Sequence, residues 1–397
     1  MFGQGRSSQR TEWGSMRVRG ARVSKTSKKA PATSHVVAAP GPLPESASAG
    51  APVPAPVAPA STLIPKLALS LLLAAGFVWV LRRGGLPIMP ARAAFVAVRW
   101  WLIPPYLLLC CAGMFLRTYR WIYLLRPLSA RLSAKAVFGA GLVGYAIVFF
   151  APLRTGEVAR PWLVARRREV GFLQAAGTVV AERIIDGVTL SLILVSGLVA
   201  SKLLDPLPDH IGKLPVSVAA LPAAAYGTLP VFGTAVLIML AFRRWRAASQ
   251  RLVQRVVGLV SVRLAEWAIL RVEKLSDGLA LLRPEHARAY LRDTAMYWFV
   301  MFASNWVLLR ACGVPARPAE AAVILGVTGM GSLVPSGPGF FGTFQLASYA
   351  ALALFFLEPV VLGPGAAFTV LGYSTNVVLT ILSSALGIAL MRTEPER

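Results

Sequence analysis

Long apolar runs alternate with clusters of charged residues along most of this chain. A membrane core about 30 Å thick needs roughly 20 apolar residues in a helix, and six runs approach that length once their flanks are counted. These runs are residues 67–81, 101–116, 184–200, 221–242, 294–309 and 366–391. The pattern predicts an all-α, polytopic transmembrane helix bundle.

Three further apolar runs, 137–153, 318–334 and 340–357, are short, rich in glycine or next to proline. The stretch from 326 to 345, GVTGMGSLVPSGPGFFGTFQ, holds six glycines and two prolines, a density that no regular helix tolerates. We therefore expect about six to eight spans and two re-entrant or broken segments, at 137–160 and 326–345. Paired broken segments in transport proteins are typical of a substrate site, although close helix packing through small residues explains the same glycines.

Composition and charge support the membrane interpretation. Hydrophobic residues make up 56% of the chain, the mean hydropathy is +0.63 and the net charge is +24. Because the basic residues crowd into the N-terminal tail and the loops, they indicate a positive-inside topology rather than a nucleic-acid partner. We expect a multi-pass protein of the plasma membrane, a bacterial inner membrane, with a cytoplasmic N-terminus.

The basic loops also favour a re-entrant course for residues 137–153. Both flanks of this run are rich in arginine and lysine, so both prefer the cytoplasm, and a hairpin satisfies that preference where a full span does not. The loop 201–215 is then outside and the segment 243–293, which contains a basic amphipathic helix, is inside. One loop fits poorly, because it is placed outside yet carries Arg82, Arg83, Arg92 and Arg99.

The chain divides into three parts by composition. Residues 1–62 are basic and then rich in proline and alanine, without apolar periodicity, and they predict a disordered cytoplasmic tail. Residues 63–392 form the transmembrane domain, which includes the segment 243–293, and residues 393–397 are a short tail.

Two charged clusters border the apolar runs. Arg154, Glu157 and Arg160 repeat every three residues, so on a helix Glu157 can pair with either arginine and leave about one positive charge unpaired. Guanidinium groups match phosphate oxygens, which makes these arginines a candidate phosphate clamp; ordinary interfacial anchoring is the alternative.

The second cluster is Glu182, Arg183 and Asp186, at the entry to a span, where Arg183 and Asp186 can pair at i, i+3. Its closeness to the first cluster in the sequence suggests one shared polar site. The cysteines and histidines lack metal-ligand spacing, and we expect neither metal nor cofactor.

Four motifs, LRTYRWIYLL, APLRTGEVARPWLV, VVAERIIDGVTL and PSGPGFFGTFQ, occur in this order. Together they resemble the lysylphosphatidylglycerol synthase transmembrane region family, or flippase-like integral membrane proteins, over about residues 65–391. The resemblance adds further residues to the substrate-binding site of Arg154, Glu157, Arg160, Glu182, Arg183 and Asp186: Arg120, Gly337, Gly339, Gly342 and Gln345. Phe340 and Gln345 replace the glycine and glutamate that the family usually shows, which removes one carboxylate.

The resemblance implies that the protein moves a phospholipid or polyprenyl-linked lipid headgroup across the membrane. We expect no aminoacyl-transferase domain, since only RTEPER follows Met391, and no catalytic residue, since common catalytic motifs do not occur. The alternative is a membrane-embedded transferase or a subunit of one, in which Glu157, Glu182 or Asp186 acts as a base. A separate transferase protein is a possible partner, and the sequence does not determine the oligomeric state.

Deleting residues 1–60 should leave the thermal stability of the purified protein in detergent within a few degrees of the full chain, because this tail has too few apolar residues to dock. Thermal unfolding of both forms tests this expectation. A large loss of stability would show that the tail packs onto the bundle.

Overall fold

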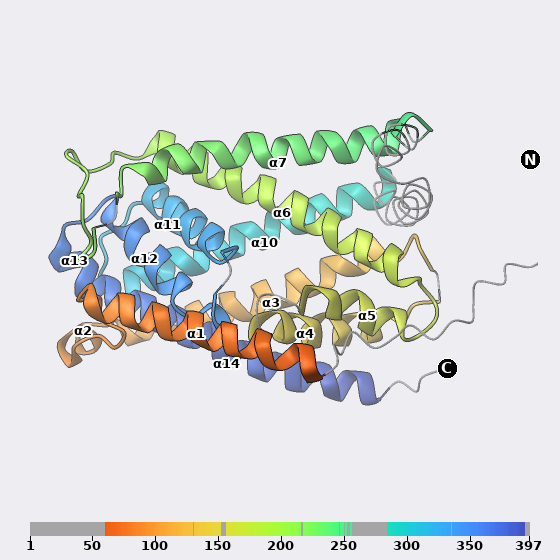
Figure 1. Cartoon of the computed structure of the whole chain (residues 1–397), viewed down its shortest axis with the longest axis horizontal. Coiled ribbons are helices and arrows are strands. Elements are labelled where there is room, and N and C mark those ends of the chain that lie inside the picture. The colour runs from red at the N-terminus through yellow and green to blue at the C-terminus, as the bar shows by residue number, and fades with distance from the viewer. Residues whose placement is uncertain are drawn as a thin grey trace, which may run out of the picture. The chain divides into compact units, whose positions relative to one another are not determined.

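A computed structural model of the chain describes residues 60–393 apart from 130, 152–155, 216, 246, 250, 252–254, 256–283 and 335. Over these residues the chain forms helices and no β-strand (Figure 1), which confirms the predicted all-α class. Residues 1–59 of the predicted tail and most of the segment 243–293 lie outside the described residues, and the last three residues of the predicted tail, 60–62, begin a helix.

Five stretches of the described chain are long and apolar enough to cross a membrane. Their main helices are α1 (Ala60–Arg83), α3 (Ile103–Leu125), α6 (Phe172–Ala200), α7 (Ala220–Arg244) and α14 (Pro364–Arg392). The stretches at α3 and α14 begin a few residues earlier, at Trp100 and Glu358. Large apolar side chains remain exposed on all five of them, including Leu72, Leu108, Leu192, Leu237 and Leu382. Exposed apolar surface of this extent is unusual in soluble proteins and suits contact with acyl chains.

The sixth predicted run, 294–309, lies in α10 (Pro284–Ala311), which packs along α3. This helix is long enough to span, but it begins with the charged sequence PEHARAYLRD and is not among the five apolar stretches. The predicted apolar run thus forms only part of α10, because the charged residues before it belong to the same helix.

Two groups of shorter helices lie toward opposite ends of the bundle (Figure 1). At one end are α4 (Ala134–Phe150) and α5 (Ala159–Ala165); toward the other are α11 (Pro318–Gly331), α12 (Thr343–Ala353) and α13 (Glu358–Leu362). Within each group two helices pack together across the break, α4 on α5 and α11 on α12. The helix is therefore interrupted within both segments that the sequence identified as broken.

The two breaks meet inside the bundle. Phe149, near the end of α4, makes an edge-to-face contact with Phe340 of η3 (Pro338–Phe340), at 5.3 Å between ring centroids. The neighbouring Gly339 has a left-handed backbone (φ 72°), and a Cβ atom there would lie 2.8 Å from the Tyr373 hydroxyl and 3.2 Å from the Phe149 ring. Glycine is needed here for both backbone conformation and space.

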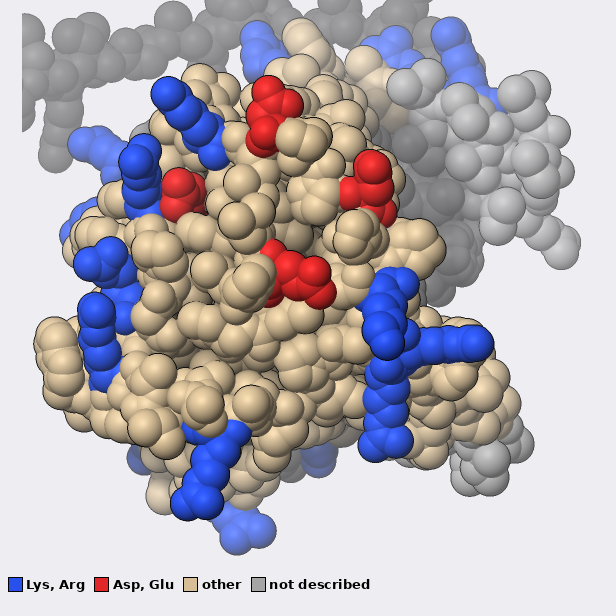
Figure 2. Space-filling model, turned by 90° about the vertical axis from the view of Figure 1, so that its left-hand side faces the viewer, with Lys and Arg blue, Asp and Glu red and all other residues tan. Residues whose placement is uncertain are grey.

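The end of the bundle that carries α2 (Arg92–Val96) and α13 joins loops that are distant in sequence. The Lys213 amide donates to the Gly84 carbonyl at 2.8 Å, and the Tyr349 hydroxyl donates to the Pro87 carbonyl at 2.6 Å. Figure 2 shows acidic side chains near the middle of this face and basic ones around them. The loop 82–99, which fitted the topology poorly, thus shares its end of the bundle with the loop 201–215, as the sequence scheme requires.

Lys135 in the first turn of α4 and Arg166 at the end of α5 should lie on the same side of the membrane. Each would be changed to cysteine in a background where Cys110, Cys111 and Cys312 are serine, and labelled in intact cells with an impermeant maleimide. We expect the two positions to label alike, and oppositely to a cysteine at Lys213. Opposite labelling of positions 135 and 166 would make the segment between them a full span.

Candidate functional site

Two carboxylates occupy the middle of α6. Glu182 and Asp186 are one turn apart and buried, with 0% and 9% of their surfaces exposed, and Asp186 is near the centre of this long apolar helix. Removing a carboxylate from water costs on the order of several kcal/mol unless a partner compensates the charge. Such residues in membrane helices are generally paired and functional.

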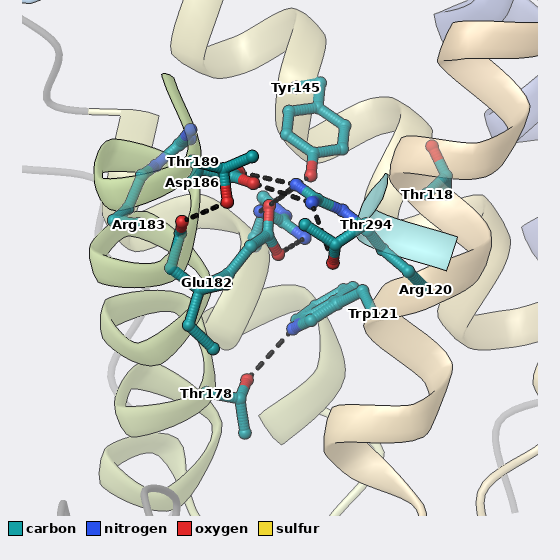
Figure 3. Close-up of polar contacts among 12 residues, drawn as sticks. Thr118, Arg120, Trp121, Tyr145, Thr178, Glu182, Arg183, Asp186, Thr189 and Thr294 are labelled. Atoms are coloured by element: carbon teal, nitrogen blue, oxygen red, sulfur yellow. Dashed lines mark hydrogen bonds and ion pairs between the residues drawn. The ribbon is translucent and has the colours of Figure 1, made fainter. Parts of the chain in front are cut away.

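Asp186 is held by Arg120, which reaches from α3 (Figure 3). Nη1 of Arg120 donates to Oδ1 at 2.6 Å and Nη2 donates to Oδ2 at 2.5 Å, a bidentate pair. From α10, the Trp298 indole donates to Oδ1 at 3.2 Å, and the Thr294 hydroxyl accepts from Arg120 at 3.4 Å. The pair therefore ties α3, α6 and α10 together.

Glu182 is held in the same manner by Arg160 of α5. The two terminal nitrogens of Arg160 donate to the two carboxylate oxygens at 3.1 and 2.9 Å, and the Tyr145 hydroxyl of α4 donates to Oε1 at 2.7 Å. Nη2 of Arg120 is 3.6 Å from the same Oε1. With their hydrogen-bond partners, the two ion pairs thus form one network across five helices of the bundle core, α3, α4, α5, α6 and α10.

Aromatic rings enclose the Arg160 guanidinium. Its central carbon lies 4.2 Å from the Trp121 ring centroid and 4.1 Å from that of Tyr145, distances at which cation–π attraction is significant. The Trp121 indole in turn donates to Thr178 at 2.9 Å. A Cβ atom at Gly144 would lie 2.2 Å from Cγ of Arg160, so α4 needs a glycine where Arg160 crosses it.

The local pairing predicted from sequence differs from the observed pairing. Arg183 does not pair with Asp186; it donates to Glu157 at 3.2 Å, in a partly exposed ion pair. Arg160 pairs with Glu182, and Arg154 lies outside the described residues. The long-range partners prevail because bidentate, buried ion pairs are stronger than i, i+3 contacts on a helix surface.

A cavity of about 380 Å³ opens beside this network. Its polar part is lined by Arg117, Tyr145, Arg183, Asp186, Tyr297 and Trp298. Its apolar part is lined by Leu308, Leu325, Phe344, Phe368 and Leu379. Both helix breaks contribute, since Phe149 and Gly339 are also in the wall. The site is thus amphipathic and central.

The glycines of the predicted motif lie in two different places, the cavity wall and the contact with α1. Gly339 lines the cavity, whereas Gly337 and Gly342 lie against α1, where added Cβ atoms would be 2.5 Å from Ala74 and 2.2 Å from Phe77. Gln345 is buried and its side-chain oxygen accepts from the Gly342 amide at 2.7 Å, which caps α12. The side-chain oxygen of Gln345 is therefore bound to the backbone at the start of α12.

Three residues of the site were missed by the sequence analysis: Arg117, Tyr145 and Trp298. Arg117 was assigned to a cytoplasmic flank because the apolar run ends at 116, but α3 continues to Leu125 and places Arg117 in the cavity wall. The available signal was the spacing of Arg117 and Arg120, one helical turn apart. Among the described residues, no group of histidine, cysteine and acidic side chains is arranged to hold a metal ion.

Comparison with known proteins agrees with the motifs. Residues 67–384 match the family described as the lysylphosphatidylglycerol synthase TM region. The chain belongs to this family. The matched range contains both helix breaks and every predicted site residue, so the family resemblance found in the sequence is confirmed.

One curated protein that is similar to this chain is named glycosyltransferase AglD, from Haloferax volcanii (strain DS2). The two sequences are 26% identical over 287 residues, which cover 67% of this chain and 45% of AglD. The chain therefore spans less than half the length of that relative. No solved structure matches this lysylphosphatidylglycerol synthase TM region protein.

Replacing Arg120 by glutamine should destabilise the protein strongly, because Asp186 would remain buried without its counter-ion. Breaking a buried pair from one side costs about 3 to 5 kcal/mol. The double variant Arg120→Gln/Asp186→Asn should lose less stability than the sum of the two single variants. Thermal unfolding in detergent measures all three, with Arg310→Gln, at an exposed helix end, as the control. Strict additivity would show that the pair is not energetically coupled.

Proposed function

We propose that this protein moves the polar headgroup of a membrane phospholipid or polyprenyl-linked lipid from one leaflet to the other. The observation that carries the proposal is the amphipathic cavity at the meeting point of the two helix breaks. Its charged part suits a headgroup and its apolar part suits the adjoining hydrocarbon. At about 380 Å³ it falls within the size range of ligand pockets.

The helix breaks support a transport role. Non-helical backbone is tolerated at membrane depth where it is buried in protein or lines a wet cavity, and discontinuous helices commonly build the substrate sites of transporters. We propose that α4–α5 and α11–α12 are re-entrant hairpins that enter from opposite sides of the membrane. Their contact through Phe149 and Phe340 would then separate the two halves of the headgroup path.

The distribution of charge supports an orientation. Arg126, Arg131, Arg166, Arg167 and Arg168 flank α4 and α5 at one end of the bundle, and Arg392 ends α14. By the positive-inside rule this end faces the cytoplasm. The N-terminal segment then also begins in the cytoplasm, and the plasma membrane remains our expected location.

A transferase is the second candidate, because the relative AglD is named a glycosyltransferase. The geometry of the described site favours translocation. Both oxygens of Glu182 and both of Asp186 accept hydrogen bonds from arginines, so neither carboxylate is arranged to take a proton from a substrate. Glu157, the third candidate base, is bound to Arg183 in an ion pair. Evidence for a transferase would be a product that the purified protein forms only when a glycosyl or aminoacyl donor is present.

Transport should depend on the junction between the breaks. Purified protein would be reconstituted in vesicles with fluorescently labelled phosphatidylglycerol, without any glycosyl or aminoacyl donor. Dithionite quenches only the label in the outer leaflet, so quenching of the lipid that began in the inner leaflet would report its movement. Gly339→Ala should reduce the initial rate several-fold, because the added methyl group strains the backbone and meets Phe149 and Tyr373.

Gly76→Ala on α1 is the matched control, because no atom lies within 4 Å of the added methyl group. It should transport at the rate of the unmodified protein. Wild-type protein that moves lipid no faster than empty vesicles, while forming product from a glycosyl or aminoacyl donor, would reject the translocator and favour the transferase.

A further inference from the structure

Among the residues that the structure describes, the polar site contains one more arginine than it has acidic residues. Four arginines line the cavity or its ion-pair network, and three carboxylates lie among them: Arg117, Arg120, Arg160 and Arg183 against Glu157, Glu182 and Asp186. Each carboxylate is bound by a different arginine. Asp186 is bound by Arg120, Glu182 by Arg160 and Glu157 by Arg183.

Arg117 is the arginine that remains. In the described structure it forms neither an ion pair nor a hydrogen bond, and its buried Nε has no acceptor. Its guanidinium carbon lies 3.9 Å from the Tyr145 ring centroid. The ring holds one face of the guanidinium by cation–π attraction, and the Tyr145 hydroxyl is fixed on Glu182. The edge of the guanidinium is left for another partner.

The position of Arg117 gives that partner access. Arg117 is only partly buried and lines the cavity, whereas Arg120 and Arg160 are fully buried behind the wall. A cation without a counter-ion costs free energy in a poorly solvated site, and such residues in membrane helices are characteristically functional. An anion that enters the cavity supplies the missing charge.

We infer that Arg117 binds the anionic phosphate group of the ligand, with Tyr145 as the platform that holds its guanidinium flat. The inference rests on the proposed function and assigns its anion-binding residue. Arg120 and Arg160 are positioning residues, because their donors already hold Asp186 and Glu182. A planar guanidinium donates two parallel hydrogen bonds to phosphate oxygens, which an ammonium group does not reproduce.

Binding of defined lipids to the purified full-length protein in detergent tests the inference without requiring transport. The probes are fluorescent phosphatidylglycerol, fluorescent diacylglycerol, which lacks the phosphate, and inorganic phosphate as a competitor. Arg117→Gln should weaken phosphatidylglycerol binding about tenfold or more, the scale of one charge-assisted interaction, and leave diacylglycerol binding unchanged. The affinity of Arg117→Lys for phosphatidylglycerol should lie between those of Arg117→Gln and the unmodified protein.

Arg126→Gln is the control, because Arg126 is exposed at the end of the same helix. It should bind phosphatidylglycerol like the unmodified protein. Competition by inorganic phosphate that disappears in Arg117→Gln would support an anion site that also takes free phosphate. Absence of such competition, with the tenfold loss retained, would support a site for the lipid phosphate alone.

Thermal stability separates a binding role from a structural one. Arg117→Gln should unfold at or above the temperature of the unmodified protein, because it removes an unpaired charge. Equal phosphatidylglycerol binding by Arg117→Gln and the unmodified protein, no preference of the unmodified protein for phosphatidylglycerol over diacylglycerol, or a marked fall in unfolding temperature would each overturn the inference. Phosphate-dependent binding without lipid movement in vesicles would reject only the proposed translocation.

Discussion

The bidentate ion pair between Arg120 and Asp186 is the interaction on which the interior of this protein depends. It joins α3 to α6 in the buried core of the bundle, and Trp298 of α10 completes the hydrogen bonding of the carboxylate. Because neither charge is tolerated alone in such surroundings, the three helices must keep their relative positions. The Arg160–Glu182 pair extends the same constraint to α5, and so fixes the broken segment against the core.

This arrangement separates structural charge from functional charge. The paired arginines and carboxylates cancel one another, whereas the cavity beside them keeps the unpaired Arg117 and a long apolar wall. A fully neutralised site would have little attraction for an anion, and a site with many unpaired charges would be costly to bury. Among the described residues, the single excess cation of this network would attract the headgroup that we propose, while the cost of burial stays small.

The sequence predicted the features that arise from local composition. Apolar runs identified the spanning helices, and dense glycine and proline located the break at Gly339. It also brought Arg160, Glu182 and Asp186 to one site. It did not predict their partners, because these depend on helix packing between residues far apart in the chain. Arg117 was missed since hydropathy ended α3 too early.

We propose that the headgroup enters the cavity between the two helix breaks. Photo-crosslinking tests it directly, with protein in vesicles that contain phosphatidylglycerol carrying a diazirine on its headgroup, and peptide mapping by mass spectrometry. We expect adducts on cavity-lining residues such as Met114 of α3 and Trp298 of α10. Adducts confined to the loops at the two ends of the bundle, with none on cavity-lining peptides, would contradict it.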